Sequence, residues 1–215
     1  MAIVEKRPEH QAIYQKIRDL VLFGVLVPGQ AVTIQGLTEL VGAGMTPARE
    51  AIRRLTAEGA LSAGDNRRVT VPLITREKLD QISHARLSIE PKLAELGAAK
   101  LNESCLNDMV HFDSKVDEAI NSGDIEKYLE YNYRFHFRLY EQAEADVLLK
   151  IAASLWLQIG PSLRIVCGRF GTTNLPDKHS EALAALNAGD AKTAAEAIEA
   201  DIRQGIGQIR LALSD

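Results

Sequence analysis

From Thr75 onward the chain carries the three-to-four-residue spacing of apolar side chains that is typical of amphipathic helices. This spacing predicts helices near 75–101, 103–121, 124–144, 146–159, 161–170, 176–188 and 190–213. Pro91 should kink or interrupt the first of them, because proline has no amide hydrogen to donate to the preceding turn. We therefore expect residues 76–215 to form an all-helical bundle.

The first 75 residues follow a different order of elements. Here the sequence predicts helices over 10–23, about 33–41 and 46–59, followed by a β-hairpin of 60–62 and 68–71. Thr33 suits the N-cap of the second helix, and Pro47 falls in the first turn of the third, where proline is tolerated. Three helices followed by a hairpin is the order of a winged helix-turn-helix. The chain as a whole should be mainly α, with a DNA-binding domain over 1–75 and a helical domain over 76–215.

Charge is distributed unevenly between these two parts. The net charge is −4, but residues 1–75 hold nine Lys/Arg against seven Asp/Glu, and residues 76–215 hold sixteen against twenty-two. The difference indicates different partners for the two parts, although so small a basic excess does not by itself establish nucleic-acid binding. No apolar run reaches the roughly 18 residues that a membrane span needs, and the two cysteines are too few for a disulfide framework. We expect a cytoplasmic protein.

The predicted third helix has one apolar face and one polar face. Its buried stripe should consist of Ala48, Ala51, Ile52 and Leu55, and its outward face of Thr46, Arg49, Arg53 and Thr56. Two arginines one turn apart suit the major groove, because guanidinium groups match phosphates and guanine edges. The alternative is a solvated helix with an ion pair between Glu50 and Arg54. The tight turn before the helix and the basic Arg67-Arg68 pair after it favour DNA binding.

This region resembles the DNA-binding domain of GntR-type regulators. The family pattern TPxREAxxRLxxEG is matched by Thr46, Pro47, Arg49, Glu50, Ala51, Arg54, Leu55, Glu58 and Gly59. The resemblance implies base and phosphate contacts from the third helix and the wing, and the candidates are Thr46, Arg49, Arg53, Arg54, Arg67 and Arg68. Gly44-Met45 replaces the usual Ser-Arg, and Arg68 replaces the usual wing glycine.

Several ionisable or polar side chains interrupt the apolar stripes of the helical part. They are Arg86, Asn132, His136, His179 and Asp201. Burying such groups without partners is costly, so partners are required. Asn132 and His136 lie four residues apart on one helix face, and other helices of a bundle can add His179 and Asp201 to complete a nitrogen and oxygen site for a divalent ion. The alternative for each residue is a buried polar group hydrogen-bonded to its neighbours.

Residues 76–215 also resemble the FCD domain of the FadR branch of GntR regulators. The segments that carry this resemblance are Arg86–Glu90, NYRFHFRLYEQA and HSEALAALNAGDAKTAAEAIEADI. It implies a divalent metal (Zn²⁺, Ni²⁺ or Mn²⁺) on Asn132, His136, His179 and Asp201, with Asp201 standing where histidine is usual. It also implies a small carboxylate effector bound by Arg86, for which Arg134 and Arg164 are further candidates.

Together these features predict a transcriptional regulator that responds to a small ligand. We expect a homodimer, without membrane association, on a pseudo-palindromic double-stranded DNA operator, with repression relieved by the effector. A metal-dependent hydrolase or isomerase is the first alternative, but the sequence has no HExxH or nucleophile motif, so we do not expect an enzyme. A protein-binding module without DNA affinity is the second alternative.

Overall fold

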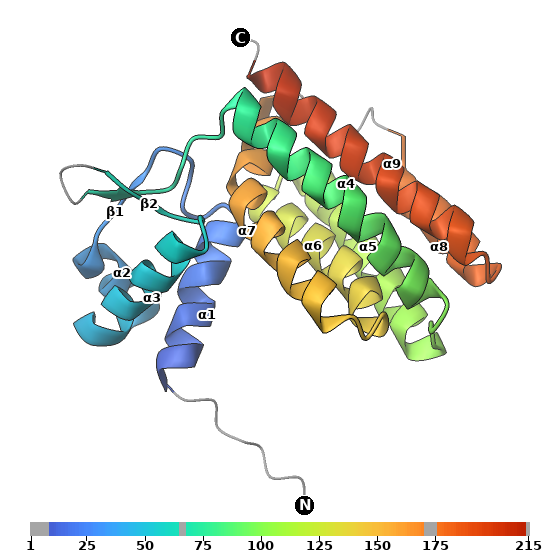
Figure 1. Cartoon of the computed structure of the whole chain (residues 1–215), viewed down its shortest axis with the longest axis horizontal. Coiled ribbons are helices and arrows are strands. Elements are labelled where there is room, and N and C mark those ends of the chain that lie inside the picture. The colour runs from blue at the N-terminus through green and yellow to red at the C-terminus, as the bar shows by residue number, and fades with distance from the viewer. Residues whose placement is uncertain (1–8, 65–67, 170–175, 214–215) are drawn as a thin grey trace, which may run out of the picture.

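The N-terminal part of the chain is a compact winged helix-turn-helix in the computed structural model (Figure 1). The structure describes the backbone of residues 9–64, 68–169 and 176–213, and the side chains of 10–64, 68–164 and 176–213. The elements of this part are α1 (Glu9–Leu22), β1 (Ala31–Val32), α2 (Ile34–Val41), α3 (Met45–Ala57), β2 (Ser62–Ala63) and β3 (Val69–Thr70). Thr33 caps α2 as predicted, since its hydroxyl accepts a hydrogen bond of 3.0 Å from the Gly36 amide.

The predicted hairpin is present, and it belongs to a three-stranded antiparallel sheet in the order β1-β3-β2. In the central strand β3, Thr70 pairs with both Ala31 and Ser62, and Val69 pairs with both Val32 and Ala63. The sequence analysis did not predict β1. This two-residue strand exists through its pairing with β3, almost forty residues later, and carries no local pattern of its own.

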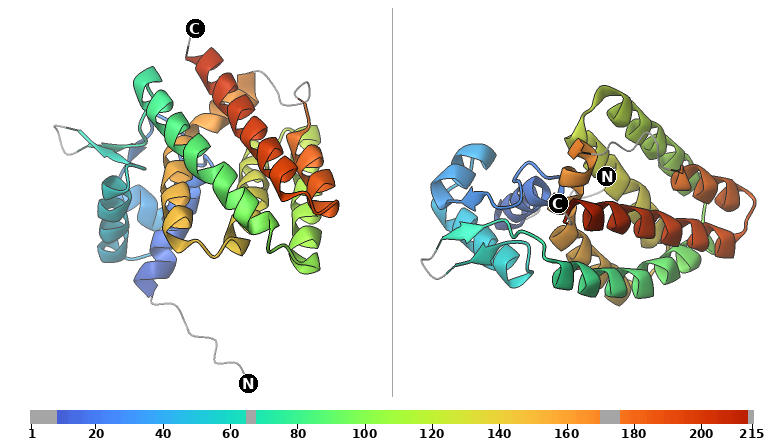
Figure 2. Two further views of the ribbon diagram at one scale, coloured as in Figure 1. Left: turned by 45° about the vertical axis from the view of Figure 1, so that its right-hand side comes forward. Right: turned by 90° about the horizontal axis from the view of Figure 1, so that it is seen from above.

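The rest of the described chain is a bundle of helices. Its elements are α4 (Arg76–Ala98), α5 (Glu103–Ser122), α6 (Ile125–Gln142), α7 (Asp146–Arg169), α8 (Lys178–Asn187) and α9 (Ala191–Ala212). Short polar side chains start these helices: Thr75, Asn102, Asp124, Asp177 and Asp190 each accept a hydrogen bond from an amide of the first turn. Long pairs of helices, α4 with α9 and α5 with α6, lie side by side (Figure 2). The prediction of a mainly α chain with these two parts is confirmed.

Two predicted helix interruptions were wrong. The chain was expected to form two helices on either side of residue 160, but α7 continues through Pro161 without a break. Pro91 likewise lies inside an uninterrupted α4. A proline removes one hydrogen bond of a helix, and packing on both sides of that point can hold the helix together despite the loss.

Helix α7 joins the two parts of the molecule. At Gly160 its backbone lies so close to α1 that a Cβ atom there would approach the carbonyl oxygen of Leu22 to 2.6 Å. Only glycine permits this contact. The winged helix therefore packs directly on the helical bundle through α1. None of the helices in the described ranges combines the length and apolar character that crossing a bilayer requires.

Candidate functional site

Helix α3 presents the two faces that its sequence predicted. Ala48, Ala51, Ile52 and Leu55 are buried in the core of the winged helix, whereas Thr46 and Arg49 are exposed. Arg53 is also exposed and forms a surface ion pair with Glu50, in which the guanidinium and carboxylate approach to 2.6 Å. This ion pair is weak and solvated, so a DNA phosphate or base edge could replace it.

Arg54, on the neighbouring face, has a different environment. Its Nε donates to Glu58 at 2.9 Å, and its guanidinium lies 3.7 Å from the ring centroid of Tyr14 on α1. The Tyr14 hydroxyl donates to the other oxygen of Glu58, and burial together with this carboxylate raises the pKa of Tyr14 to about 12. Arg54 thus helps to fix α3 against α1. The alternative ion pair of Arg54 with Glu50 was wrong, because Glu50 pairs with Arg53.

In the wing, Arg68 is exposed, and Arg67 lies outside the described residues. The roles of Thr46, Arg49, Arg53, Arg54, Arg67 and Arg68 in DNA binding stay predictions.

In the helical bundle, three ionisable groups that the sequence singled out come together. His136 on α6, His179 on α8 and Asp201 on α9 each offer a ligand atom, and these atoms all lie within 4.8 Å of one another. Both histidines are buried, and the Asp201 side chain is 24% exposed. Asn132, one turn before His136, is buried and lines the adjoining pocket. Two imidazoles and a carboxylate from three different helices form a donor set that suits a divalent transition metal.

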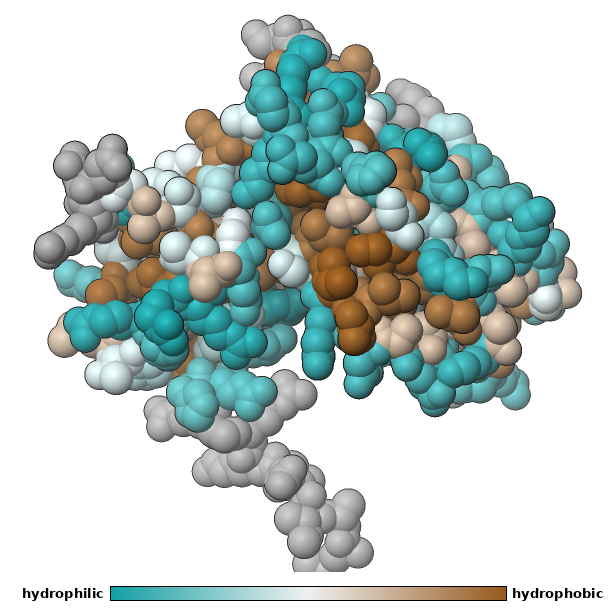
Figure 3. All heavy atoms as spheres, in the orientation of Figure 1, coloured by the Kyte–Doolittle hydropathy of each residue, from teal (hydrophilic) through white to brown (hydrophobic). Residues whose placement is uncertain are grey.

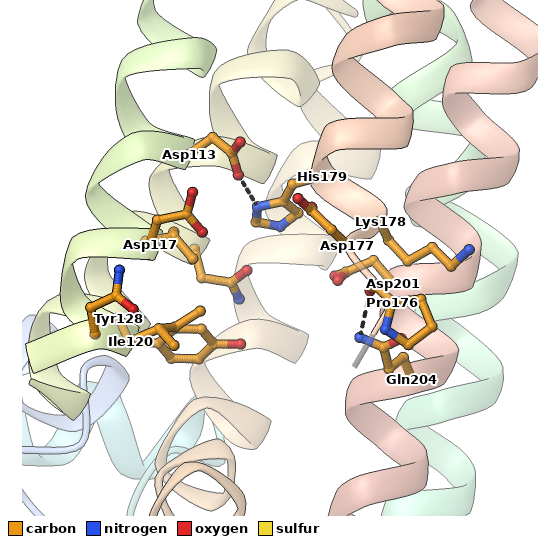
Figure 4. A pocket seen from close by; sticks show the side chains of 13 residues that line it. Asp113, Asp117, Ile120, Tyr128, Pro176, Asp177, Lys178, His179, Asp201 and Gln204 are labelled. Atoms are coloured by element: carbon orange, nitrogen blue, oxygen red, sulfur yellow. Dashed lines mark hydrogen bonds and ion pairs between the residues drawn. The ribbon is translucent and has the colours of Figure 1, made fainter. Parts of the chain in front are cut away.

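His179 shows most directly that this site requires a further group. Its Nδ1 lies 3.0 Å from Oδ1 of Asp113 on α5, so Nδ1 carries the proton and donates it to the carboxylate (Figure 4). The ring is also stacked on Phe135, with centroids 3.8 Å apart. Nε2 is left as a buried lone pair without a hydrogen-bond partner among the described residues. A carboxylate that orients an imidazole in this way is the usual support of a metal-ligating histidine.

The contacts of His136 also leave room for a bound cation, because there are fewer protons than hydrogen-bond contacts. The Tyr140 hydroxyl donates to Glu90 at 2.9 Å, His136 Nδ1 lies 3.2 Å from that hydroxyl, and His136 Nε2 lies 3.1 Å from Asp201. With a neutral imidazole and ionised carboxylates, this chain of three contacts has two protons. If Nε2 donates to Asp201, then Nδ1 and the Tyr140 oxygen face each other as two acceptors; if Nδ1 donates to Tyr140, then Nε2 and the Asp201 oxygen do. A cation bound to Nε2 and Asp201 would satisfy the second arrangement.

The pKa values of the three groups are displaced from their ordinary values in different directions. Burial lowers the pKa of His136 below its ordinary value, which disfavours an imidazolium there. Burial also acts to lower the pKa of His179, but its hydrogen bond to Asp113 and the charge of Asp201 outweigh burial and raise it. The pKa of Asp201 falls to about 2, because the contacts with His136 and His179 overcome the opposing effect of burial. Asp201 is therefore a carboxylate at neutral pH.

A pocket of about 300 Å³ opens beside these residues (Figure 4). Its polar lining comes from Asp113, Asp117, Asn121, Asn132, Asp177, Lys178, His179, Asp201 and Gln204, and its other walls from Val116, Ile120, Tyr128 and Pro176. The pocket therefore lies between two walls. One wall is formed by α5 and α6, and the other by the first turn of α8 and the middle of α9. A small ligand in it would meet the metal-ligating atoms at one end.

None of the three arginines predicted to bind an effector belongs to this lining. Arg86 is buried in α4 and forms a two-point ion pair with Glu90, at 2.6 and 3.1 Å. Arg134 pairs with Glu130 on the same helix, and the Arg164 side chain packs near Gly24. Their role in effector binding stays a prediction.

Sequence reasoning missed Asp113, Tyr140 and the role of Glu90. Asp113 occurs in a segment, FDSKVDEAI, whose acidic residues look like an ordinary solvated face. Glu90 accepts hydrogen bonds from Tyr140 and from the indole of Trp156 at 2.8 Å, and these partners lie 50 and 66 residues away. The RxxxE spacing of Arg86 and Glu90 was visible in the sequence. Residues four apart on a helix lie one turn from each other, so this spacing indicates an ion pair between the two side chains.

Comparison with known proteins agrees with this structure over most of the chain. Residues 9–71 match the bacterial regulatory proteins of the gntR family, and residues 81–204 match the FCD domain. The HTH-type transcriptional regulator McbR of Escherichia coli is 30% identical over 171 residues, which are 78% of this chain and 77% of that protein. The Nta operon transcriptional regulator of Aminobacter aminovorans is 26% identical over 60% of each chain.

Solved structures show the same fold. That of E. coli McbR/YncC superposes with a TM-score of 0.87 at 24% identity and covers 96% of this chain and 99% of its own. A GntR family member from Pseudomonas syringae pv. tomato has a TM-score of 0.58 at 22% identity, with 95% and 86% covered. These families and relatives are transcriptional regulators and not enzymes. The chain belongs to the GntR family of bacterial DNA-binding transcriptional regulators, in the branch that carries an FCD domain.

Proposed function

We propose that this regulator binds its operator as a homodimer and that a small molecule, bound next to a divalent metal in the FCD domain, changes its operator affinity. The winged helix over 1–75 would contact DNA, and the helical domain over 76–215 would bind metal, ligand and the second protomer. Repression relieved by the ligand is the proposed direction of control. A coupling free energy of about 1–3 kcal/mol between ligand and operator would suffice.

The buried, unpartnered Nε2 of His179 is the observation that carries the metal proposal. The residues that would hold the ion are His136, His179 and Asp201, with Asn132 as a further candidate. When bound, the ion would supply a coordination position that a ligand can occupy. The protein's own groups orient the site: Asp113 fixes the His179 tautomer, and the Tyr140 hydroxyl fixes the ring of His136. Zn²⁺, Ni²⁺ and Mn²⁺ all accept such a donor set.

The proposed homodimer is supported by an apolar patch on the bundle. The patch lies over α4 and α7 in the space-filling view (Figure 3). Ile151 of α7 is 42% exposed, and Leu87, Leu148 and Leu155 around it are partly buried. Contiguous apolar surface on the bundle would be covered by a second copy, as in most symmetric oligomers. The two α3 helices of such a dimer could occupy successive major grooves.

Elemental analysis of purified variants tests the metal proposal. His136→Ala and His179→Ala should each lose bound metal, whereas His84→Ala, a change of an exposed histidine on α4, should keep it. Gel-shift titrations with operator DNA, with and without a chelator, then show whether metal changes DNA affinity. Wild-type metal content in both His136→Ala and His179→Ala would remove the metal from the proposal and leave a DNA-binding regulator with a hydrogen-bonded pocket.

A further inference from the structure

The pocket beside the metal-ligating residues is strongly acidic. Among the described residues, four carboxylates line it, those of Asp113, Asp117, Asp177 and Asp201, against one basic side chain, Lys178. The Lys178 ammonium forms an ion pair of 2.6 Å with Glu181, which is not part of the lining. A divalent ion at one end would offset two of the negative charges and would leave the lining net negative. Such a lining repels anions and attracts cations.

The two carboxylates at the mouth of this pocket, those of Asp117 and Asp177, form no ion pair with a lysine or arginine of the described residues. Asp117 has no hydrogen-bond or ion-pair partner among the described residues, and Asp177 uses one oxygen to cap α8 through the Ser180 amide at 2.8 Å. Asp113 and Asp117 lie on the α5 wall, and Asp177 lies across from them beside His179 (Figure 4). Burial and the nearby charges of Asp113 and Asp177 raise the pKa of Asp117. Like charges therefore face one another across the pocket.

Two further observations indicate what kind of cation this is. His179, whose side chain is 7% exposed, lines the same pocket, and its unpartnered Nε2 places the metal-ligating atoms at one end of it. Asp117 and Asp177, however, belong to no group of three ligand atoms within 4.8 Å, and His136, His179 and Asp201 form the one such group in the described residues. The mouth carboxylates thus lack the three closely spaced ligand atoms that would hold a second metal ion by themselves, and they leave room for a larger, organic cation.

We propose that the pocket recognises a small aliphatic amine, whose ammonium group is bound by Asp117 and Asp177 and whose carbon chain contacts Val116, Ile120 and Tyr128. The apolar side chains supply contact area, and the two carboxylates supply charge-assisted hydrogen bonds. This inference rests on the proposed function in taking the pocket as the effector site. It differs from the carboxylate effector that the family resemblance implies, because a carboxylate would enter among four like charges.

Three four-carbon compounds that differ in charge provide the test: 1,4-diaminobutane, 1,4-butanediol and succinate. Each is titrated calorimetrically into the full-length, metal-loaded protein. We expect 1,4-diaminobutane to bind at least about tenfold more tightly than 1,4-butanediol, and succinate not to bind. Tighter binding of succinate than of the diamine, or no binding of any of the three compounds, would overturn the inference.

Matched variants locate the binding site. Asp117→Asn and Asp177→Asn should each weaken 1,4-diaminobutane about threefold to tenfold, and asparagine at 177 still caps α8. Glu118→Gln removes an exposed charge next to Asp117 that does not line the pocket, and it should leave the affinity unchanged. Wild-type affinity in both asparagine variants would contradict the assignment.

Elemental analysis of the same preparations separates this inference from the proposed metal site. Diamine binding that depends on Asp117 in a protein without metal would support the inference while the metal proposal fails. A fully metal-loaded protein that prefers succinate would overturn the inference while the metal proposal stands.

Discussion

The two histidines of the candidate metal centre have pKa values displaced in opposite directions, although their ring centroids are 5.3 Å apart. Burial governs His136 and lowers its pKa. His179 is equally inaccessible, but the carboxylates of Asp113 and Asp201 stabilise its protonated form and raise its pKa. A proton therefore competes with a metal for Nε2 of His179 at a higher pH than for His136.

Metal affinity should accordingly decline as the pH falls, and it should do so from above the ordinary histidine pKa of about 6.5. Each imidazole that must lose its proton weakens affinity by about tenfold per pH unit below its pKa. Competitive titration with a metal-binding dye at several pH values measures this. Asp113→Asn should move the onset to lower pH and weaken affinity at pH 7.5 about tenfold to a hundredfold.

Asp108→Asn provides the control for that variant, because Asp108 lies on the same helix and pairs with Arg138 at the surface. It should leave the pH profile as in the wild type. A pH-independent affinity between 5.5 and 7.5 would show that the histidines are not ligands.

How far this centre could be predicted depends on the kind of residue. His136, His179 and Asp201 interrupt apolar stripes, and buried polar groups need partners, so their positions indicated a need for partners, while the resemblance to the FCD domain gave the reason to group them. Asp113 could not be found in this way, since it lies in a polar stretch and acquires its role when α5 packs against α8. Arg86 was correctly expected to be buried. Its partner in the structure is Glu90 on its own helix, whereas the family resemblance had implied an effector carboxylate as its partner.

Among the elements, helix α3 carries two neighbouring arginines, Arg53 and Arg54, with different surroundings. Arg53 has an exposed side chain and an ion pair with Glu50 on the same helix, so it is free to exchange partners. Arg54 is held by Glu58 and the ring of Tyr14, which connects α3 with α1. A helix that reads DNA must be fixed from behind, because imprecise positioning loses base contacts.

Alanine variants should separate the roles of these two arginines. Arg53→Ala should weaken operator binding about fivefold to a hundredfold if the side chain contacts a base. If it contacts phosphate alone, specific and nonspecific binding should weaken alike, and the slope of log affinity against log salt should fall by about one. Arg54→Ala should instead lower the midpoint of urea unfolding. Gel shifts at several salt concentrations and urea titrations measure both, and unchanged DNA binding in Arg53→Ala would place Arg53 outside the interface.

The helices themselves were predictable from apolar spacing, but the continuity of α7 was not. The sequence analysis divided this helix at residue 160, yet α7 continues through Gly160 and Pro161. The neighbouring Gly160 lies against the α1 backbone, so tertiary packing on this stretch of α7 outweighs the lost hydrogen bond. The short strand β1 was missed for the related reason that its partner is remote in sequence.

For the whole molecule, the apolar patch on α4 and α7 predicts how two copies associate. Ile151→Glu places a charge on the exposed apolar face of α7 and should raise the dimer dissociation constant about thirtyfold or more, because the charge would be buried without a partner. Val110→Glu is the matched control, since Val110 is 50% exposed on α5, outside the patch. Analytical ultracentrifugation at micromolar concentration distinguishes the variants. A dimeric Ile151→Glu protein would place the interface elsewhere.

The glycine contact between α1 and α7 bears on how a signal could travel through this molecule. If the close packing of Gly160 on the Leu22 backbone is kept when ligand binds, each protomer would rotate as one rigid body. In a dimer, a small rotation of the two protomers about their interface would change the distance between their α3 helices. Successive major grooves on one face of DNA are about 34 Å apart, so operator affinity would depend on how closely the distance between the two α3 helices matches this spacing.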